Sequence, residues 1–253
     1  MNPKKMILRN KKGVLLLLLI FFSQCRTLNL SHDYYDRNFE CMSKSGWKDE
    51  KAFQKYKLAW EKYRSDYNEE NSKIKQANYV IAGDSLVHLF SNDLIKKEFP
   101  AITLIPRGIG GDMTESLLER LPDNVISLSP KTLIIEIGGN DLIYGKCLGL
   151  MEKNIKKIIN EVQAKLPETE IIFISVPPTA IPRLNSIVPV YNQFLSKLEK
   201  KYKNISFVDL WEEMRDENIP TIKSEYLRER DPIHFNEKGY QLWGKLLRPY
   251  LNK

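Results

Sequence analysis

Apolar and polar positions follow a regular order from residue 78 to the end of the chain. Short apolar runs rich in β-branched residues predict strands at 79–82, 102–105, 132–137, 171–176 and 205–208. Between and after them, apolar residues repeat every three or four positions, which predicts helices at 86–99, 113–121, 151–166, 188–202 and 237–251. Strands that alternate with helices predict an α/β fold with three layers and a five-stranded parallel sheet.

A further helix is predicted ahead of this region, at residues 48–76. One set of aromatic residues recurs there at spacings of 3, 4, 3 and 4: Phe53, Tyr56, Trp60, Tyr63 and Tyr67. This spacing places them on one face of an amphipathic helix, with charged residues opposite. We expect the aromatic face to pack on the helix's own domain. A face for a partner protein or a membrane interface is the alternative.

The first 24 residues have the pattern of a signal peptide. Basic residues precede an apolar run at 14–22, which is shorter than the roughly 20 residues that a membrane-spanning helix needs. The sequence Phe-Ser-Gln-Cys at residues 22–25 resembles a bacterial lipoprotein box. We therefore expect a mature chain that starts at a lipidated Cys25, followed by a tether at 25–47. An exported, membrane-anchored protein is expected, with a secreted or periplasmic protein as the alternative.

The net charge of +7 changes its meaning once the signal is set aside. Residues 1–24 hold five of the 39 basic residues and no acidic ones, so the mature chain has 34 basic and 32 acidic residues. An excess of +2 gives no reason to expect a nucleic-acid partner. Export also permits Cys41 and Cys147 to form a disulfide. We expect two free thiols instead, because the sequence does not show their separation. No metal-binding pattern of Cys or His is present.

Four polar stretches lie where the strands or the last helix are predicted to meet an active site. They are Gly-Asp-Ser at 83–85, Gly-Gly-Asp at 110–112, Gly-Gly-Asn-Asp at 138–141 and Asp-Pro-Ile-His at 231–234. Ligands of parallel sheets bind outside the carboxyl ends of the strands, and Ser85 follows the first strand. His234 has a carboxylate three residues earlier, Asp231, and is the candidate base for a Ser85 nucleophile. The N–H groups of Ser85 and Gly111 and the side-chain amide of Asn140 are the candidate oxyanion donors.

These four blocks, in this order, resemble the SGNH hydrolases, also called the GDSL family, over roughly residues 76–253. The resemblance implies a flavodoxin-like hydrolase domain at 77–253, ester hydrolysis through a serine acyl-enzyme, and no cofactor. It assigns Ser85, His234 and Asp231 to catalysis and Ser85, Gly111 and Asn140 to the oxyanion hole. Pro106 departs from the pattern, since relatives often have Asn there. We interpret Asp84 and Asp141 as acids that shape turns.

The expected activity is hydrolysis of acyl esters by an enzyme similar to acetylhydrolases and lysophospholipases. The substrate stays open: a short-chain ester, a lysophospholipid or an O-acetylated carbohydrate would each suit the chemistry. One alternative is an O-acyltransferase that uses the same residues, with a sugar hydroxyl in place of water. The other is a surface binding protein with a vestigial site. The sequence does not indicate the oligomeric state.

Overall fold

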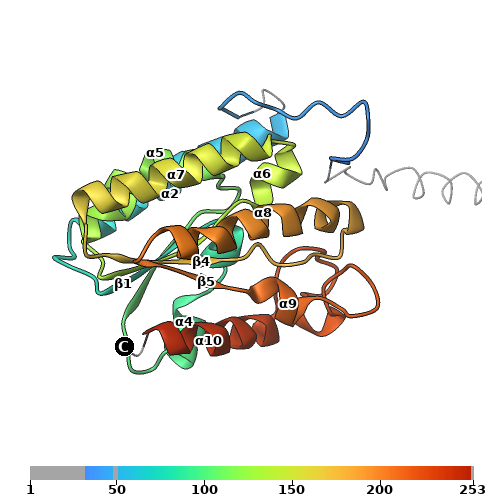
Figure 1. The fold of residues 1–253 in the computed structure, drawn as a ribbon. Coiled ribbons are helices and arrows are strands. Elements are labelled where there is room, and N and C mark those ends of the chain that lie inside the picture. The colour runs from blue at the N-terminus through green and yellow to red at the C-terminus, as the bar shows by residue number, and fades with distance from the viewer. Residues whose placement is uncertain (1–31, 48–50, 252–253) are drawn as a thin grey trace, which may run out of the picture. The chain divides into compact units, whose positions relative to one another are not determined.

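A five-stranded, all-parallel sheet forms the centre of the computed structural model, which describes residues 32–47 and 51–251. The strands are β1 (Tyr79–Gly83), β2 (Leu104–Gly108), β3 (Thr132–Glu136), β4 (Glu170–Ile174) and β5 (Ile205–Val208). They lie in the order β2-β1-β3-β4-β5, which is the flavodoxin-like order (Figure 1). The prediction of a parallel, five-stranded α/β fold is therefore confirmed.

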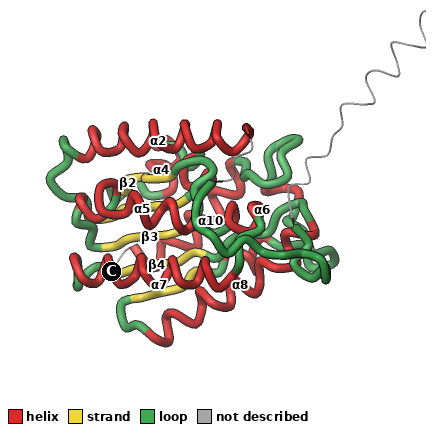
Figure 2. The backbone as a smooth tube through the Cα atoms, turned by 90° about the horizontal axis from the view of Figure 1, so that it is seen from above, coloured by secondary structure: helices red, strands yellow, loops and turns green. Residues whose placement is uncertain are grey.

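Helices cover both faces of the sheet, and neighbouring strand residues pack into opposite cores (Figures 1 and 2). Leu133 and Ile135 face a core shared with α5 (Thr114–Asn124), α7 (Leu148–Lys165) and α8 (Pro182–Lys201). Ile134 faces the other core, whose helices are α3 (Ser85–His88), α4 (Asn92–Glu98), α9 (Leu210–Met214) and α10 (Glu237–Leu251). A further short helix, α6 (Gly139–Tyr144), follows β3. Because both faces are covered, the strands read as continuous apolar runs.

Several element boundaries differ from the predicted ones for local reasons. The helix predicted at 86–99 is broken into α3 and α4, because the Ser91 hydroxyl accepts the Leu94 N–H and starts a new helix. Strand β2 begins two residues later than predicted and includes Pro106, which is tolerated because β2 is an edge strand. The helix predicted at 188–202 begins earlier, because α8 starts at Pro182, a residue suited to the first helical turn.

The aromatic helix is α2 (Lys51–Asn71), which ends five residues before the predicted residue 76, and it packs on the α/β domain as predicted. Trp60 is buried, with 3% of its surface exposed, and Tyr67 is half-buried. The Asn71 amide donates to the carbonyls at the end of α5. Tyr56 is an exception on this face, since 53% of its surface is exposed. The side chain of Phe53 lies outside the described residues.

Residues 32–47, here called the N-terminal strap, are fixed to the domain by a disulfide between Cys41 and Cys147. The prediction of two free thiols is wrong: a parallel bridge pairs Met42 with Lys146 and brings the two cysteines to a Cα–Cα distance of 4.9 Å. The described part of the predicted tether is thus attached along its length. The predicted signal peptide and Cys25 lie outside the described residues. Within 32–47 and 51–251, no helix is long and apolar enough to cross a membrane.

A buried lysine joins the strap to the domain. The Lys146 side chain has no exposed surface, and its ammonium donates to the carbonyls of Lys44 and Gly46 at 3.1 and 2.9 Å. It also pairs with Glu115 Oε1 at 2.8 Å. A buried ammonium needs such partners, because its desolvation is otherwise uncompensated. The strap therefore supplies two of the three acceptors that the buried Lys146 ammonium contacts.

Candidate active site

The candidate residues meet at one end of the sheet because all five strands are parallel. Ser85 follows β1 directly, Gly111 lies between β2 and α5, and Asn140 lies in the first turn of α6. Strands β1 and β3 are neighbours in the sheet, although β2 lies between them in the sequence. This change of direction in the strand order is where flavodoxin-like folds bind their ligands.

A hydrogen-bond chain connects Ser85, His234 and Asp231. The Ser85 Oγ lies 2.9 Å from His234 Nε2, and His234 Nδ1 lies 2.7 Å from Asp231 Oδ2. The other Asp231 oxygen accepts the backbone N–H groups of Ile233 and His234, each at 3.0 Å. Asp231 is thus held at both oxygens, which fixes the imidazole plane and leaves Nε2 directed at the serine. The geometry is that of a nucleophile, a base and the group that orients the base.

The electrostatics of Asp231 suit an anion at this position. Its partial burial alone would raise the pKa of the carboxyl, but the two backbone N–H donors and the imidazole outweigh burial and lower the pKa. Asp231 therefore stays ionised at neutral pH. An ionised Asp231 can only accept a hydrogen bond, so the proton of the neutral imidazole lies on Nδ1. The other nitrogen, Nε2, is then available to receive a proton from Ser85.

A tight turn after β1 holds Ser85 at the end of the strand. Gly83 comes so close to β3 that a Cβ on this residue would lie 2.1 Å from the Glu136 carbonyl oxygen. Asp84 then caps α3, since its Oδ1 accepts the Leu86 N–H at 2.9 Å. The interpretation of Asp84 as a turn-shaping acid agrees with this contact. Ser85 becomes the first residue of α3, with its N–H at the free amino end of the helix.

Gly111 and Asn140 lie beside the serine, where donors for an oxyanion are expected. Gly111 has φ +82°, a left-handed conformation that favours glycine, and its N–H is hydrogen-bonded to no residue in the described part of the chain. The Asn140 amide donates to the Asp112 carbonyl at 3.0 Å and to Asp84 Oδ2 at 3.2 Å. Asp84 therefore has a second contact, one that orients the Asn140 amide.

Buried carboxyl groups surround these donors. Burial raises the pKa of Asp84 to about 6, although the Leu86 N–H and His234 act in the opposite direction. Burial, and then the adjacent Asp84 carboxyl, raise the pKa of Glu136 well above its usual range. Two neighbouring carboxyl groups in a buried site are more stable with one of them protonated than with two negative charges. Burial also raises the pKa of Asp141 to about 7, against the two hydrogen bonds from Thr114 that join α6 to α5.

A buried ion pair fixes the loop that follows β2 to helix α5. Asp112 and Arg120 have no exposed side-chain surface, and Arg120 Nη2 lies 2.7 Å from Asp112 Oδ2. The same nitrogen donates to the carbonyls of Gly83, the last residue of β1, and Arg107, the last but one of β2. Arg120 thus connects the turn that carries Ser85 to the loop that carries Gly111.

Sequence reasoning missed the supporting residues Glu136, Asp112 and Arg120. Glu136 had a usable signal, because an acid within a buried apolar strand requires an explanation. Asp112 was noted only as part of the Gly-Gly-Asp block. Nothing in the sequence linked it to Arg120, a residue on the next helix whose burial follows from the tertiary structure.

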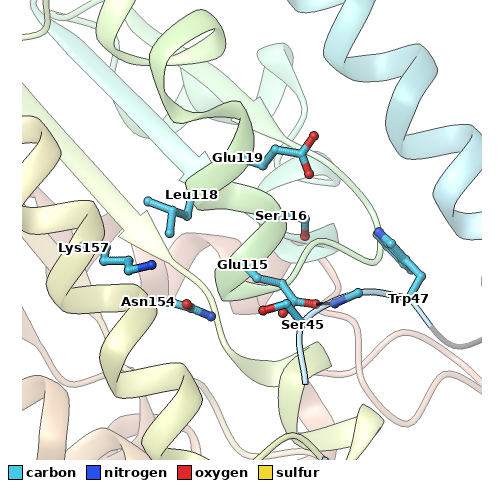
Figure 3. A pocket seen from close by; sticks show the side chains of 9 residues that line it. Ser45, Trp47, Glu115, Ser116, Leu118, Glu119, Asn154 and Lys157 are labelled. Carbon is cyan, nitrogen blue, oxygen red and sulfur yellow. Dashed lines mark hydrogen bonds between the residues drawn. The ribbon is translucent and has the colours of Figure 1, made fainter. Parts of the chain in front are cut away.

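A separate hollow of about 440 Å³ lies between the strap, α5 and α7 (Figure 3). Its lining includes Ser45 and Trp47 from the strap, Glu115 and Glu119 from α5, and Asn154 and Lys157 from α7. None of the predicted site residues lines it. The strap forms one of its walls, and the Gly46 N–H donates to Glu115 Oε1 at 2.8 Å across its edge.

Comparison with known proteins gives one family. The model of the GDSL-like lipase/acylhydrolase family matches residues 76–242, about two thirds of the chain. The match contains all four blocks. A comparison with curated proteins found no match.

Solved structures resemble the same region. One, from Streptococcus pneumonia and provisionally described as a platelet activating factor, is 26% identical with a TM-score of 0.72, covering 78% of this chain and 95% of its own. A GDSL-like lipase from Bacteroides thetaiotaomicron is 23% identical with a TM-score of 0.62, covering 74% and 96%. An acetyl xylan esterase, AlAXEase, is 20% identical with a TM-score of 0.59, covering 68% and 99%. The two structures below 25% identity support the fold alone.

Proposed function

Since this chain belongs to the GDSL-like lipase/acylhydrolase family, we propose that it is a serine esterase that hydrolyses acyl esters through a covalent acyl-enzyme. The hydrogen-bond chain from Ser85 Oγ through His234 to Asp231, at 2.9 and 2.7 Å, carries the proposal. A serine hydroxyl is a weak nucleophile at neutral pH, and an oriented imidazole at this distance is what activates it.

In the proposed reaction, Ser85 Oγ attacks the ester carbonyl carbon and its proton passes to His234 Nε2. The tetrahedral intermediate collapses, the C–O bond to the alcohol breaks, and His234 returns the proton to the leaving oxygen. Water then attacks the acyl carbon while His234 Nε2 takes its proton, the bond from the acyl carbon to Ser85 Oγ breaks, and His234 returns the proton to Ser85 as the acid leaves. Asp231 keeps its charge throughout and stabilises the imidazolium that forms in each half.

The proposed oxyanion donors are the N–H groups of Ser85 and Gly111 and the amide of Asn140. The Gly111 N–H has no hydrogen-bond partner among residues 32–47 and 51–251, so it can donate to an oxyanion without breaking another of these bonds. The Asn140 amide already donates to Asp112 and to Asp84. To stabilise an oxyanion it must share the hydrogen that points at Asp84, whose contact at 3.2 Å is the longer of the two. Donors that are already in place lose little free energy to reorganisation when charge develops on the carbonyl oxygen.

The alcohol and the acyl chain are the finer parts of the proposal. The chemistry of the site suits an O-acetylated carbohydrate, a short-chain ester and a lysophospholipid alike, and the name of the structural neighbour AlAXEase, an acetyl xylan esterase, includes the first of these. A panel of esters from acetyl to long-chain acyl groups, assayed with Ser85→Ala alongside, tests the function. A fluorophosphonate should add one phosphonyl group to the wild type and none to Ser85→Ala. Equal turnover by the two proteins would refute the serine mechanism.

We also propose that the mature protein is a lipoprotein anchored to a bacterial membrane through Cys25, on the basis of the signal-like residues 1–24. A single lipid chain binds a membrane only weakly, so stable anchoring needs a second chain or another contact with the membrane. Intact-mass measurement of protein from the membrane fraction tests this, and Cys25→Ser should move the protein to the soluble fraction. A retained signal segment or an unmodified Cys25 would contradict it.

A further inference from the structure

Helix α2 contacts the loop between β2 and α5, in addition to packing on α5. The Tyr67 hydroxyl donates to the Gly108 carbonyl at 2.7 Å, where β2 ends. The Trp60 indole N–H donates to Asp112 Oδ1 at 2.9 Å, at the other end of the loop. The family match begins at residue 76, so this helix precedes the matched hydrolase segment. Helix α2 therefore contacts both ends of the loop that carries Gly111.

Tyr56 contacts the middle of the same loop. A Cβ built on Gly111 would lie 3.3 Å from a ring carbon of Tyr56 and 3.5 Å from the Tyr56 Cβ. The ring thus packs on the side of Gly111 from which a side chain is missing. On the other side of the turn, a Cβ on Gly110 would lie 3.9 Å from the Ser85 Cβ. The Gly110–Gly111 turn is accordingly enclosed between the nucleophile and a tyrosine from α2.

Trp60 also reaches the second oxyanion donor through Asp112. The Trp60 N–H fixes one oxygen of the fully buried Asp112 carboxylate, while Arg120 fixes the other. The carbonyl of the same Asp112 accepts the Asn140 amide at 3.0 Å. A shift of Asp112 would therefore move the acceptor that orients Asn140. The indole N–H is buried, so no water replaces it at Asp112 when it is removed.

We infer that α2 is a positioning element of the oxyanion hole, in which Trp60 and Tyr56 hold the Gly111 N–H and the Asn140 amide in place. The inference rests on the proposed esterase function. Trp60 and Tyr56 act through the loop and through Asn140, so they are positioning residues. Misplacement of a catalytic group by about 1 Å costs up to ~100-fold in rate, and complete loss of an oxyanion donor costs ~100- to 1,000-fold. The loss of rate caused by a loosened loop should be smaller than either of these losses.

The test uses the full-length chain in detergent and a short-chain p-nitrophenyl ester. Trp60→Phe keeps an aromatic ring and removes the N–H, and it should lower kcat roughly tenfold with KM nearly unchanged. Tyr56→Ala should lower kcat in the same direction, and its half-exposed side chain makes loss of folding a small risk. The rate of Ser85 phosphonylation should fall with kcat, because the adduct places an oxygen in the hole. The matched control is Asn68→Ala, which removes a contact between α2 and Asn124 of α5, away from the loop.

The outcomes separate positioning from simple stabilisation. Asn68→Ala should lower the melting temperature and leave kcat unchanged. In an Asn140→Ala background, Trp60→Phe should cost less than tenfold, because part of its effect passes through Asn140. Wild-type kcat in both Trp60→Phe and Tyr56→Ala, or an equal loss in Asn68→Ala, would refute the inference while leaving the esterase intact. If Trp60→Phe fails to fold, Tyr56→Ala decides alone. A wild-type protein that cleaves no ester would overturn both proposals.

Discussion

The disulfide between Cys41 and Cys147 offers the largest stability effect that can be worked out from the structure. It closes a loop with a sequence separation of 106 residues, which contains α2 and the first three strands. In the chain-entropy description, a loop of this length removes unfolded-state entropy worth about 5 kcal/mol at 25 °C. Native disulfides measured in other proteins contribute about 2–5 kcal/mol. We therefore expect the double variant Cys41→Ser, Cys147→Ser to lose about 3–5 kcal/mol of unfolding free energy.

Urea unfolding of protein without residues 1–25, followed by tryptophan fluorescence, measures this loss. With a urea slope of about 2–3 kcal/mol per M, the midpoint should fall by roughly 1–2 M. Wild-type protein in reductant should reach the midpoint of the double variant, and the variant itself should not respond to reductant. A midpoint within ~0.3 M of the oxidised wild type would refute the reasoning. It would mean that the strap detaches before the domain unfolds and that the disulfide does not constrain the global transition.

Three further predictions concern buried polar groups. Asn140→Ala should fold and lose ~100- to 1,000-fold in kcat, measured with a short-chain ester, because two backbone donors remain; a change below threefold would exclude it from the oxyanion hole. The raised pKa of Asp84 gives stability that is full below about pH 4 and is lost as the pH rises through about 6, and the raised pKa of Glu136 adds a loss in the same direction. Glu136→Gln should reduce that loss, measured by urea unfolding at pH 4.5 and 7.5, and an identical loss in both proteins would disprove the electrostatic coupling of Glu136 to Asp84. Lys146→Met should cost about 3–5 kcal/mol by leaving the Glu115 carboxylate unpaired, and a second change, Glu115→Gln, should recover part of it in the same unfolding assay.

The features predictable from the sequence were those with local signals. The strand at 205–208 and the helix at 237–251 match β5 and α10 in their bounds, because apolar periodicity and flanking polar residues are confined to a few neighbouring positions. The four blocks were found for the same reason. Helices α6 and α9, of six and five residues, are too short to show a helical period.

Other features depend on contacts between distant parts of the chain. The aromatic spacing of α2 predicted which face is buried, but not that Trp60 meets Asp112, 52 residues later. The Cys41–Cys147 pair depends on the path of the strap beside α7, which residue spacing does not encode. A pattern along one element states what must be covered, while the partner that covers it is decided by the tertiary fold.

If Cys25 carries the proposed lipid, the strap also limits how far the domain can move from the membrane. From Cys25 to His32, the first described residue, the chain advances seven residues, which is at most about 25 Å when fully extended. A free tether over the whole of 25–47 would have reached roughly 80 Å. Attachment of residues 32–47 to the domain therefore shortens the maximum distance between Cys25 and the domain to about a third. On this basis the substrates of the anchored enzyme would be those within one protein diameter of the membrane surface.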